Sequence, residues 1–373
     1  MTSPAAQEAD RQVATLLQAI ARRNPALLSA VRIGSVGYRE VRKALPPGRA
    51  MVVFFSTDKG LYRWVFTGDR EEATLLPLGK DALAAQCRDL NTRIRHLAPV
   101  EEAAGKLGDL LLSDVVADLQ ARGVTRLVVV PHGPLFAVPP GVWRVGERYL
   151  ADLFTVSELP DAGMLADGRP MTPLGKDSSV LAAGYRPAPG SSLPDLPLVD
   201  QELDRLSDAF VQARVLSGLD ARPEALTAGM GGRDLVHVAA HMTFDPAQPF
   251  DGALHLAPGQ QGGDRLTLRE IFSLPASQVG TVVLSGCQGQ ESVQSSGGAV
   301  ISLGHALAYL GVKAVVASRM SVDDLSTAVL MKHLHRSLAS GMDAAQALQQ
   351  AQAHTRRLFA HPAYWASFSV IGY

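Results

Sequence analysis

A cysteine and a histidine stand at the ends of two apolar runs of the sequence. The run TVVLSG (281–286) leads directly to Cys287, and the run LVHVAA (235–240) leads to His241. The thiolate is the reactive form of a cysteine, and a neighbouring imidazole accepts the proton that a thiol carries at neutral pH. Glycines after Cys287 would let backbone N–H groups approach a substrate carbonyl. The pattern predicts a Cys–His pair for nucleophilic catalysis, in a loop that a substrate reaches.

Each of these residue types also has a plainer interpretation. A cysteine at a strand end is commonly a small packing residue, and Cys87, within the helical pattern DALAAQCRDL, is interpreted in this way. His237, on the same apolar run as His241, is interpreted as a buried core histidine. His237, His241 and Cys287 are zinc-binding types, but HVAAH lacks the glutamate of HExxH and has a strand pattern, so we predict no metal.

The second half of the chain alternates between predicted strands and helices. Apolar runs typical of buried strands cover 180–184, 235–241, 281–286, 312–318 and 367–372. Helical patterns lie between them, at 198–212, 298–310, 325–340 and 343–358. Strands that are apolar on both faces and separated by helices form a mainly parallel sheet covered on both sides. At the carboxyl edge of such a sheet, His241 and Cys287 are expected to lie close together.

The first half carries similar elements in a different order. The sequence predicts an amphipathic helix within residues 7–23 and then a hairpin of two strands, 50–56 and 61–67. A helix at 101–122 precedes a buried strand at 126–130, and residues 161–178 have the glycine, proline and small polar residues of a linker. We therefore predict three regions, namely a helical segment at 1–45, an α/β lobe at 46–170 and a second α/β domain at 176–373.

Composition narrows the class of protein. The 35 Lys and Arg residues nearly balance the 36 Asp and Glu residues, so no basic field is present to attract nucleic acid or anionic lipid. The first residues lack a basic segment followed by an apolar one, and no apolar stretch is long enough to span a bilayer. Two cysteines are too few for a disulfide framework. We predict a cytoplasmic protein without nucleic-acid or membrane partners.

Six motifs follow one another in the order of a known family. They are RLVVVPHGPLFAVPPGVW (126–143), LPDLPLVDQELDRLSDAF (193–210), LVHVAAHMTFDP (235–246), VVLSGCQGQ (282–290), VVASRMSVDDLSTAVLMKHLH (315–335) and HPAYWASFSVIGY (361–373). Together they resemble the CHAT domain family, caspase-like cysteine proteases related to separase. Cys287-Gln288-Gly289 with an upstream histidine also fits part of the caspase signature, although Ser285-Gly286 departs from it.

The resemblance implies both a fold and a mechanism. The fold is a caspase-like α/β/α sandwich with a mainly parallel sheet, preceded by a smaller α/β lobe that resembles a protease without its catalytic pair. Cys287 is implied to be the nucleophile and His241 the general base and acid, with no metal or organic cofactor. The backbone amides of Cys287 and Met242 are implied to bind the oxyanion. The family usually has glycine at position 242, and a bulky side chain there would restrict the cleft or close it until activation.

Two neighbouring carboxylates have two interpretations. In separase relatives, an acidic residue in the segment of Asp323 and Asp324 binds a basic residue before the cleaved bond, so the resemblance implies that they form this pocket. A carboxylate selects Arg or Lys by charge-assisted hydrogen bonds. Both residues also directly precede a predicted helix, where Asp is an ordinary N-cap. The sequence leaves the two interpretations open.

The predicted function is cleavage of a protein partner by a cysteine endopeptidase. The resemblance implies a protein or peptide substrate and a protein activator. In bacterial defence, such a substrate would be a gasdermin-like pore-forming protein. The alternative is a catalytically silent CHAT module that binds a partner as a scaffold or regulator.

Overall fold

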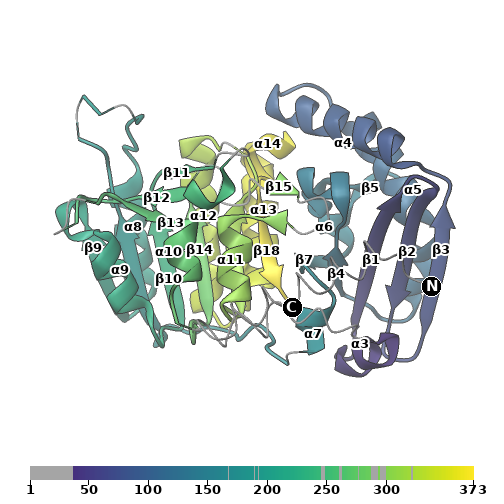
Figure 1. Ribbon diagram of the computed structural model, residues 1–373, viewed down its shortest axis with the longest axis horizontal. Coiled ribbons are helices and arrows are strands. Elements are labelled where there is room, and N and C mark those ends of the chain that lie inside the picture. The colour runs from purple at the N-terminus through teal and green to yellow at the C-terminus, as the bar shows by residue number, and fades with distance from the viewer. Residues whose placement is uncertain are drawn as a thin grey trace, which may run out of the picture.

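One large sheet forms the centre of the computed structural model, which describes residues 37–166, 168–188, 190–191, 193–244, 248–259, 263–275, 277–286, 293–294, 300–320 and 322–373. The sheet has eleven strands in the order β3-β2-β1-β4-β7-β18-β17-β14-β10-β8-β9 (Figure 1). The predicted N-terminal helix and Cys287 lie outside the described residues. No helix in the described part combines the length and apolarity needed to cross a bilayer.

Five strands of this sheet come from the first half of the chain. They are β1 (Arg49–Thr57), β2 (Gly60–Phe66), β3 (Glu71–Leu76), β4 (Arg126–Val130) and β7 (Thr155–Glu158). β1 and β2 form the predicted antiparallel hairpin, whereas β1, β4 and β7 run parallel. One face is covered by α4 (Lys80–Arg95) and α5 (Glu101–Ala121), and the other by α3 (Tyr38–Ala44) and α7 (Gly163–Ala166). Cys87 packs in the first of these cores, so its predicted packing role is confirmed.

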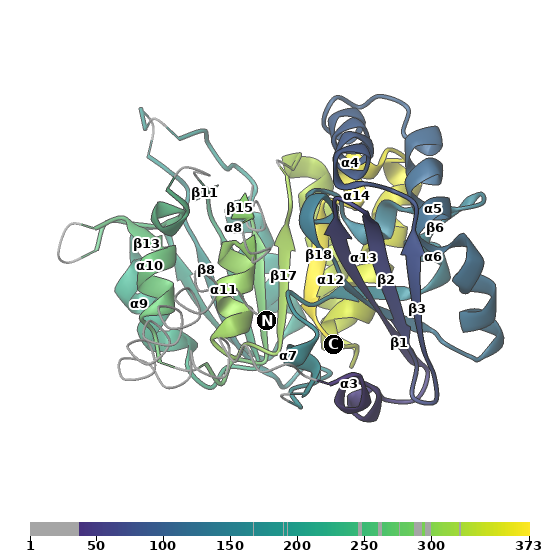
Figure 2. The same ribbon diagram turned by 45° about the vertical axis from the view of Figure 1, so that its right-hand side comes forward.

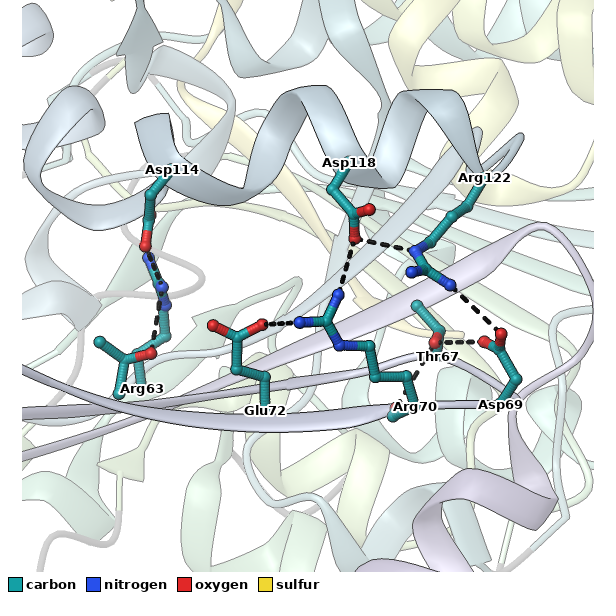
Figure 3. Close-up of polar contacts among 9 residues, drawn as sticks. Arg63, Thr67, Asp69, Arg70, Glu72, Asp114, Asp118 and Arg122 are labelled. Atoms are coloured by element: carbon teal, nitrogen blue, oxygen red, sulfur yellow. Dashed lines mark hydrogen bonds and ion pairs between the residues drawn. The ribbon is translucent and has the colours of Figure 1, made fainter.

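A polar network fixes α5 to the antiparallel strands β2 and β3 (Figure 3). Arg63 of β2 is fully buried, and its guanidinium donates to both carboxylate oxygens of Asp114, at 2.5 and 2.6 Å. These hydrogen bonds hold the pKa of Asp114 below its ordinary value. One turn further along α5, Asp118 accepts from Arg122 at 2.8 Å and from Arg70 at 3.3 Å. Charge-assisted bonds of this kind orient the helix on the sheet edge.

Six strands come from the second half. They are β8 (Ser179–Gly184), β9 (Gln212–Ser217), β10 (Leu235–Ala239), β14 (Thr281–Ser285), β17 (Ala314–Ser318) and β18 (Phe368–Gly372). All neighbouring pairs among them are parallel except β17 and β18. Alternate residues of β8, β10, β14 and β17 enter two different cores, which is why these strands are apolar on both faces. The predicted mainly parallel sheet is confirmed.

Helices cover both faces of this half. One face carries α8 (Val199–Ala209), α12 (Asp324–Ala339) and α13 (Ala344–Leu358). The other carries α9 (Pro223–Met230), α10 (Leu268–Phe272) and α11 (Leu303–Tyr309). The predicted start of the helix at 298 is wrong, because residues 300–301 form a short strand and the Ser302 hydroxyl caps α11 by accepting from the N–H of His305.

Short elements complete the described chain. The small antiparallel sheet beyond β10 consists of β11 (Met242–Thr243), β12 (Ala253–His255) and β13 (Arg265–Thr267). Two-stranded ribbons are formed by β5 (Arg144–Val145) with β6 (Arg148–Tyr149), and by β15 (Val293–Gln294) with β16 (Val300–Ile301). Two further single-turn helices are α6 (Leu150–Leu153) and α14 (Pro362–Trp365). Turns of 3₁₀ helix cover Gly133–Ala137, Pro140–Val142, Gly218–Asp220 and Pro249–Asp251.

The sheet runs without a break from one half of the chain to the other. β7 of the first half pairs with β18, the last strand of the chain, which lies in the middle of the sheet (Figure 1). At the same junction α4 contacts α14 (Figure 2). Met171 and Leu174, within the segment expected to be a linker, are both buried. The domain boundary near residues 171–175 remains a prediction. The residues before it and the residues after it contribute strands to one sheet.

Candidate functional site

His241 lies just past the carboxyl end of β10. That strand ends at Ala239, which pairs in register with Ser285, the last residue of the parallel neighbour β14. Gly286 follows, and a Cβ atom added to it would lie 2.2 Å from the carbonyl oxygen of Ala240. No real side chain tolerates so short an approach, so only glycine fits. The end of the strand that carries His241 therefore touches the residue that precedes Cys287.

The ring of His241 is held by a backbone carbonyl. Its Nε2 lies 2.7 Å from the oxygen of Pro194. A carbonyl oxygen only accepts hydrogen bonds, so Nε2 donates and carries the proton in the neutral ring. The other nitrogen, Nδ1, is then the basic one. The contact thus assigns the tautomer that leaves Nδ1 to accept a proton from a nucleophile.

The Pro194 segment is itself anchored to the sheet. Arg186 donates to both carboxylate oxygens of Asp195 at 2.5 and 2.6 Å, and these bonds lower the pKa of the Asp195 carboxyl. The N–H of Tyr185 donates to the oxygen of Ala239, at the end of β10. The segment that orients His241 therefore leaves the sheet at the end of β8 and is hydrogen-bonded there to the end of β10, the strand that leads to His241.

A hollow of about 40 Å³ opens beside His241. Its lining consists of Leu196, Leu198, Val199, Glu202, Ala240, His241, Ser285, Gly286, Val322, Asp324 and Thr327. Two oxygens of the lining residues, Ser285 Oγ and Thr327 Oγ1, are buried without a hydrogen-bond partner among the described residues. Buried polar atoms are seldom left unpaired, so this hollow suits water or a polar group of a ligand.

The two neighbouring carboxylates have different environments. Asp323 is the N-cap of α12, and its Oδ2 accepts from the N–H of Ser326 at 2.9 Å. Asp324 lines the hollow. Burial, and next to it the charge of Asp323, raises the pKa of the Asp324 carboxyl. The capping interpretation is confirmed for Asp323, and of the two residues only Asp324 is among those that line the hollow.

Met242 does not occupy the hollow with its side chain. The side chain is buried in the core under α9, α10 and α11, with its methyl group against Gly286. The N–H of His255 donates to the oxygen of His241 at 2.8 Å, which makes Met242 and Leu254 a non-hydrogen-bonded pair of β11 and β12. In such a pair the N–H groups point away from the partner strand. The amide of Met242 is therefore turned away from β12, and its side chain is not among those that line the hollow beside His241.

His237 belongs to a buried polar cluster beneath the site. It is fully buried, with Nε2 2.7 Å from Oε1 of Glu202 and Nδ1 3.3 Å from Nε2 of His335. The contact with Glu202 lacks hydrogen-bond geometry, so it is a contact of polar groups at short range. Burial, and then His237, lowers the pKa of His335. The interpretation of His237 as a core histidine is confirmed. The described ranges contain no group of three or more His, Cys, Asp or Glu side chains that could hold a metal ion.

The structure describes only one of the two cysteines, Cys87. Cys287 lies outside the described residues, and so do Gln288 and Gly289. Cys87 is buried, and burial raises the pKa of its thiol to about 12. A thiol with so high a pKa forms almost no thiolate at neutral pH. Cys87 is therefore no competitor for the role of nucleophile.

The sequence model of the CHAT domain matches residues 101–373 of the chain. The chain belongs to the CHAT domain family. No curated protein matches this CHAT domain protein in sequence. The match begins at α5 and so includes the β4 and β7 region of the first half as well as all of the second half.

Solved structures with a similar fold include separase–securin complexes and a cysteine proteinase. Two structures of the Saccharomyces cerevisiae separase–securin complex have TM-scores of 0.56 and 0.62, with 11% and 8% identity. Each match covers 90% of the CHAT protein but only 31% or 30% of the separase-complex chain, so the CHAT protein spans less than a third of that chain. The Arg-specific cysteine proteinase gingipain R has a TM-score of 0.51 and 11% identity, covering 78% of this chain and 74% of its own. At such identities the likeness shows the fold, and the predicted caspase-like α/β fold is confirmed.

Sequence reasoning missed two parts of this CHAT site. The carbonyl of Pro194 is a backbone group, and no residue type marks such a group as the partner of a histidine. The contact of Glu202 with His237 joins α8 to β10. A signal for the burial of Glu202 was the apolar spacing of α8, where Val199, Leu203 and Leu206 surround it on the buried face.

Proposed function

We propose that this CHAT protein is a caspase-like cysteine endopeptidase in which Cys287 is the nucleophile and His241 the general base and acid. The observation that carries the proposal is the contact between the end of β10 and Gly286, which brings His241 next to the residue that precedes Cys287. The hydrogen bond between His241 Nε2 and Pro194 supports it, because it leaves Nδ1 as the basic nitrogen.

The reaction follows from these roles. The Cys287 thiol gives its proton to His241 Nδ1, and the thiolate attacks the scissile carbonyl, forming a C–S bond and an oxyanion. The amides of Cys287 and Met242 donate to that oxyanion, and the amide of Met242 is turned away from β12 as this role requires. His241 then protonates the leaving amine as the C–N bond breaks. Water then gives a proton to His241 and attacks the thioester carbonyl. As the C–S bond breaks, the second product leaves as a carboxylic acid and the Cys287 sulfur takes back its proton from His241.

The substrate proposed for the enzyme is a protein. Cysteine proteinases with this fold support a peptide substrate, and the separase structures are complexes with securin. The narrower proposal is a cytoplasmic enzyme of bacterial defence that cleaves a gasdermin-like pore former after a protein activator binds. It rests on the family resemblance alone, and the fold does not distinguish this substrate from other proteins.

Labelling of Cys287 by a peptidyl acyloxymethyl ketone, a cysteine-directed electrophile, tests the proposal. The label is expected on Cys287, and His241→Ala is expected to slow it by roughly 10²- to 10⁴-fold because the thiol loses its base. Mass spectrometry of tryptic peptides locates the label, and Cys287→Ala is the control. Cys87 is an internal control, because its raised thiol pKa predicts no labelling.

Two results would count against a peptidase. One is the absence of label on Cys287, and the other is labelling that is equally fast without His241. Either result, obtained again in the presence of candidate partner proteins, favours the silent CHAT module that acts as a scaffold or regulator.

Asp324 is proposed to bind a basic side chain before the cleaved bond, whereas Asp323 is not. Asp324→Asn is expected to reduce the preference for Arg over Leu at that position by roughly tenfold, because one charge-assisted hydrogen bond is lost. Asp323→Ala is expected to leave the preference unchanged and to lower the free energy of unfolding by ~1 kcal/mol through loss of the cap. Cleavage of two peptides that differ only at this residue measures the preference.

The preference should also depend on pH. The pKa of Asp324 lies above its ordinary value of 3.8, so the carboxylate is protonated at a higher pH than an exposed Asp. The Arg preference is therefore present above the raised pKa and is lost as the pH falls through it. A preference that persists unchanged in Asp324→Asn at every pH would contradict the role of Asp324.

A further inference from the structure

Ser318 holds the peptide group that leads into Cys287. It is the last residue of β17, the strand beside β14, and it is fully buried. The registered pairing of the two strands ends at Leu284 and Ala317. Beyond that point the Ser318 hydroxyl donates a hydrogen bond to the carbonyl oxygen of Gly286. A side chain thus continues the contact between the strands where the backbone ladder stops.

We propose that Ser318 is a positioning residue of the oxyanion site, which it serves by fixing the Gly286–Cys287 peptide plane. The proposal rests on the proposed function of Cys287. A trans peptide bond is planar, and its C=O and N–H groups point in opposite directions. A hydrogen bond that fixes the direction of the Gly286 carbonyl therefore also fixes the direction of the next N–H, which is the oxyanion donor of Cys287.

Contacts on both sides make this arrangement rigid. On the β10 side, Gly286 lies against the carbonyl of Ala240, too close for any Cβ atom. On the β18 side, the N–H of Arg319 donates to the oxygen of Ser367 at 2.8 Å, and its side chain donates to the hydroxyl of Ser369 at 3.0 Å. Ser318 is thereby held between two strands. Donors that are fixed in advance stabilise an oxyanion more than donors that must reorient.

A purely structural role for Ser318 makes a different prediction. If the hydroxyl only satisfied the part-buried carbonyl of Gly286, its removal would lower stability and every kind of Cys287 reactivity together. If the Ser318 hydroxyl instead orients the N–H of Cys287, its removal weakens only reactions that form an oxyanion. Alkylation by iodoacetamide forms no oxyanion. Binding of a peptide aldehyde does, because the thiol adds to the carbonyl and gives a hemithioacetal oxygen in the place of the oxyanion.

The experiment compares these two reactions in the full chain. In Ser318→Ala, the dissociation constant of the peptide aldehyde is expected to rise by roughly 10- to 100-fold, while the rate of iodoacetamide alkylation at Cys287 stays within about twofold. Ser318→Thr keeps the hydroxyl and is expected to retain most of the aldehyde affinity. Ser367→Ala is the matched control, because it removes another buried serine hydroxyl that donates to a backbone carbonyl, that of Ala363.

Each outcome decides between the proposals. Equal loss of both reactions in Ser318→Ala, or no loss of aldehyde affinity, overturns the role of Ser318 and leaves the peptidase proposal in place. A wild-type protein that neither binds the aldehyde nor is alkylated at Cys287 overturns both. If Ser318→Ala fails to fold, as judged by its circular dichroism, Ser318→Thr and Ser318→Cys take its place. Ser318→Cys is then expected to bind the aldehyde more weakly than Ser318→Thr, which keeps the hydroxyl.

Discussion

Gly286→Ala is expected to slow labelling of Cys287 by about 100-fold and to destabilise the protein. The added methyl group would lie 2.2 Å from the oxygen of Ala240 and 2.6 Å from the methyl group of Met242, so β10 and β14 must separate at their ends. Overpacking of this kind costs about 1–3 kcal/mol of the free energy of unfolding. A displacement of about 1 Å between reacting groups slows a reaction about 100-fold. Denaturant unfolding and the rate of active-site labelling measure the two effects.

Gly231→Ala is the matched control for this substitution. Gly231 follows α9 with a φ of −55°, and a Cβ atom there meets nothing within 4 Å. Its replacement is expected to leave labelling unchanged and stability equal or slightly higher, since alanine restricts the unfolded chain. Wild-type labelling in Gly286→Ala would mean that the two strand ends need not touch for reactivity. The peptidase proposal would then lose the observation that carries it.

The parallel sheet of the second half was the most predictable part of the fold. β10, β14 and β17 are buried on both faces, so their sequences are continuous apolar runs with helices between them. β9 was not predicted, because it lies at the edge of the sheet and most of its residues are exposed. β7 was also missed, since it has only four residues and ends in a glutamate. Short or polar strands depend on their neighbours rather than on their own pattern.

The candidate site was predictable only in part. The rule that parallel strands end at one edge predicts the position of His241 at the carboxyl edge of the sheet, where the structure has it, since the rule requires only the order of strands and helices. Asp323 and Asp324 are chemically identical neighbours, and only the geometry of α12 decides that Asp323 caps the helix. The contacts of Ser318 with Gly286 and of Pro194 with His241 each involve a backbone carbonyl and join residues that are distant in sequence. The sequence carries no signal for such contacts, because they depend on how the strands and loops meet.

Arg319→Met is expected to lower the free energy of unfolding by ~3–5 kcal/mol. Arg319 is 5% exposed, and its guanidinium donates to the buried carboxylate of Glu158, to the carbonyl oxygen of Phe136 and to Ser369. Removing one member of a buried ion pair leaves the other charge without compensation, which is far more costly than removing both. Denaturant unfolding of the variant and of the wild type measures the difference.

The double variant Arg319→Met with Glu158→Leu separates this explanation from a loss of packing. It is expected to be more stable than Arg319→Met, because no buried charge remains unpaired. A double variant as unstable as the sum of the single variants would contradict the charge explanation.

Phe136 and Glu158 belong to the first half of the chain, whereas Arg319 directly follows Ser318, which holds the Gly286 peptide. If the first half supports the site through this contact, loss of the ion pair should affect Cys287 in the same way as Ser318→Ala. Aldehyde binding at Cys287 should then weaken more than iodoacetamide alkylation.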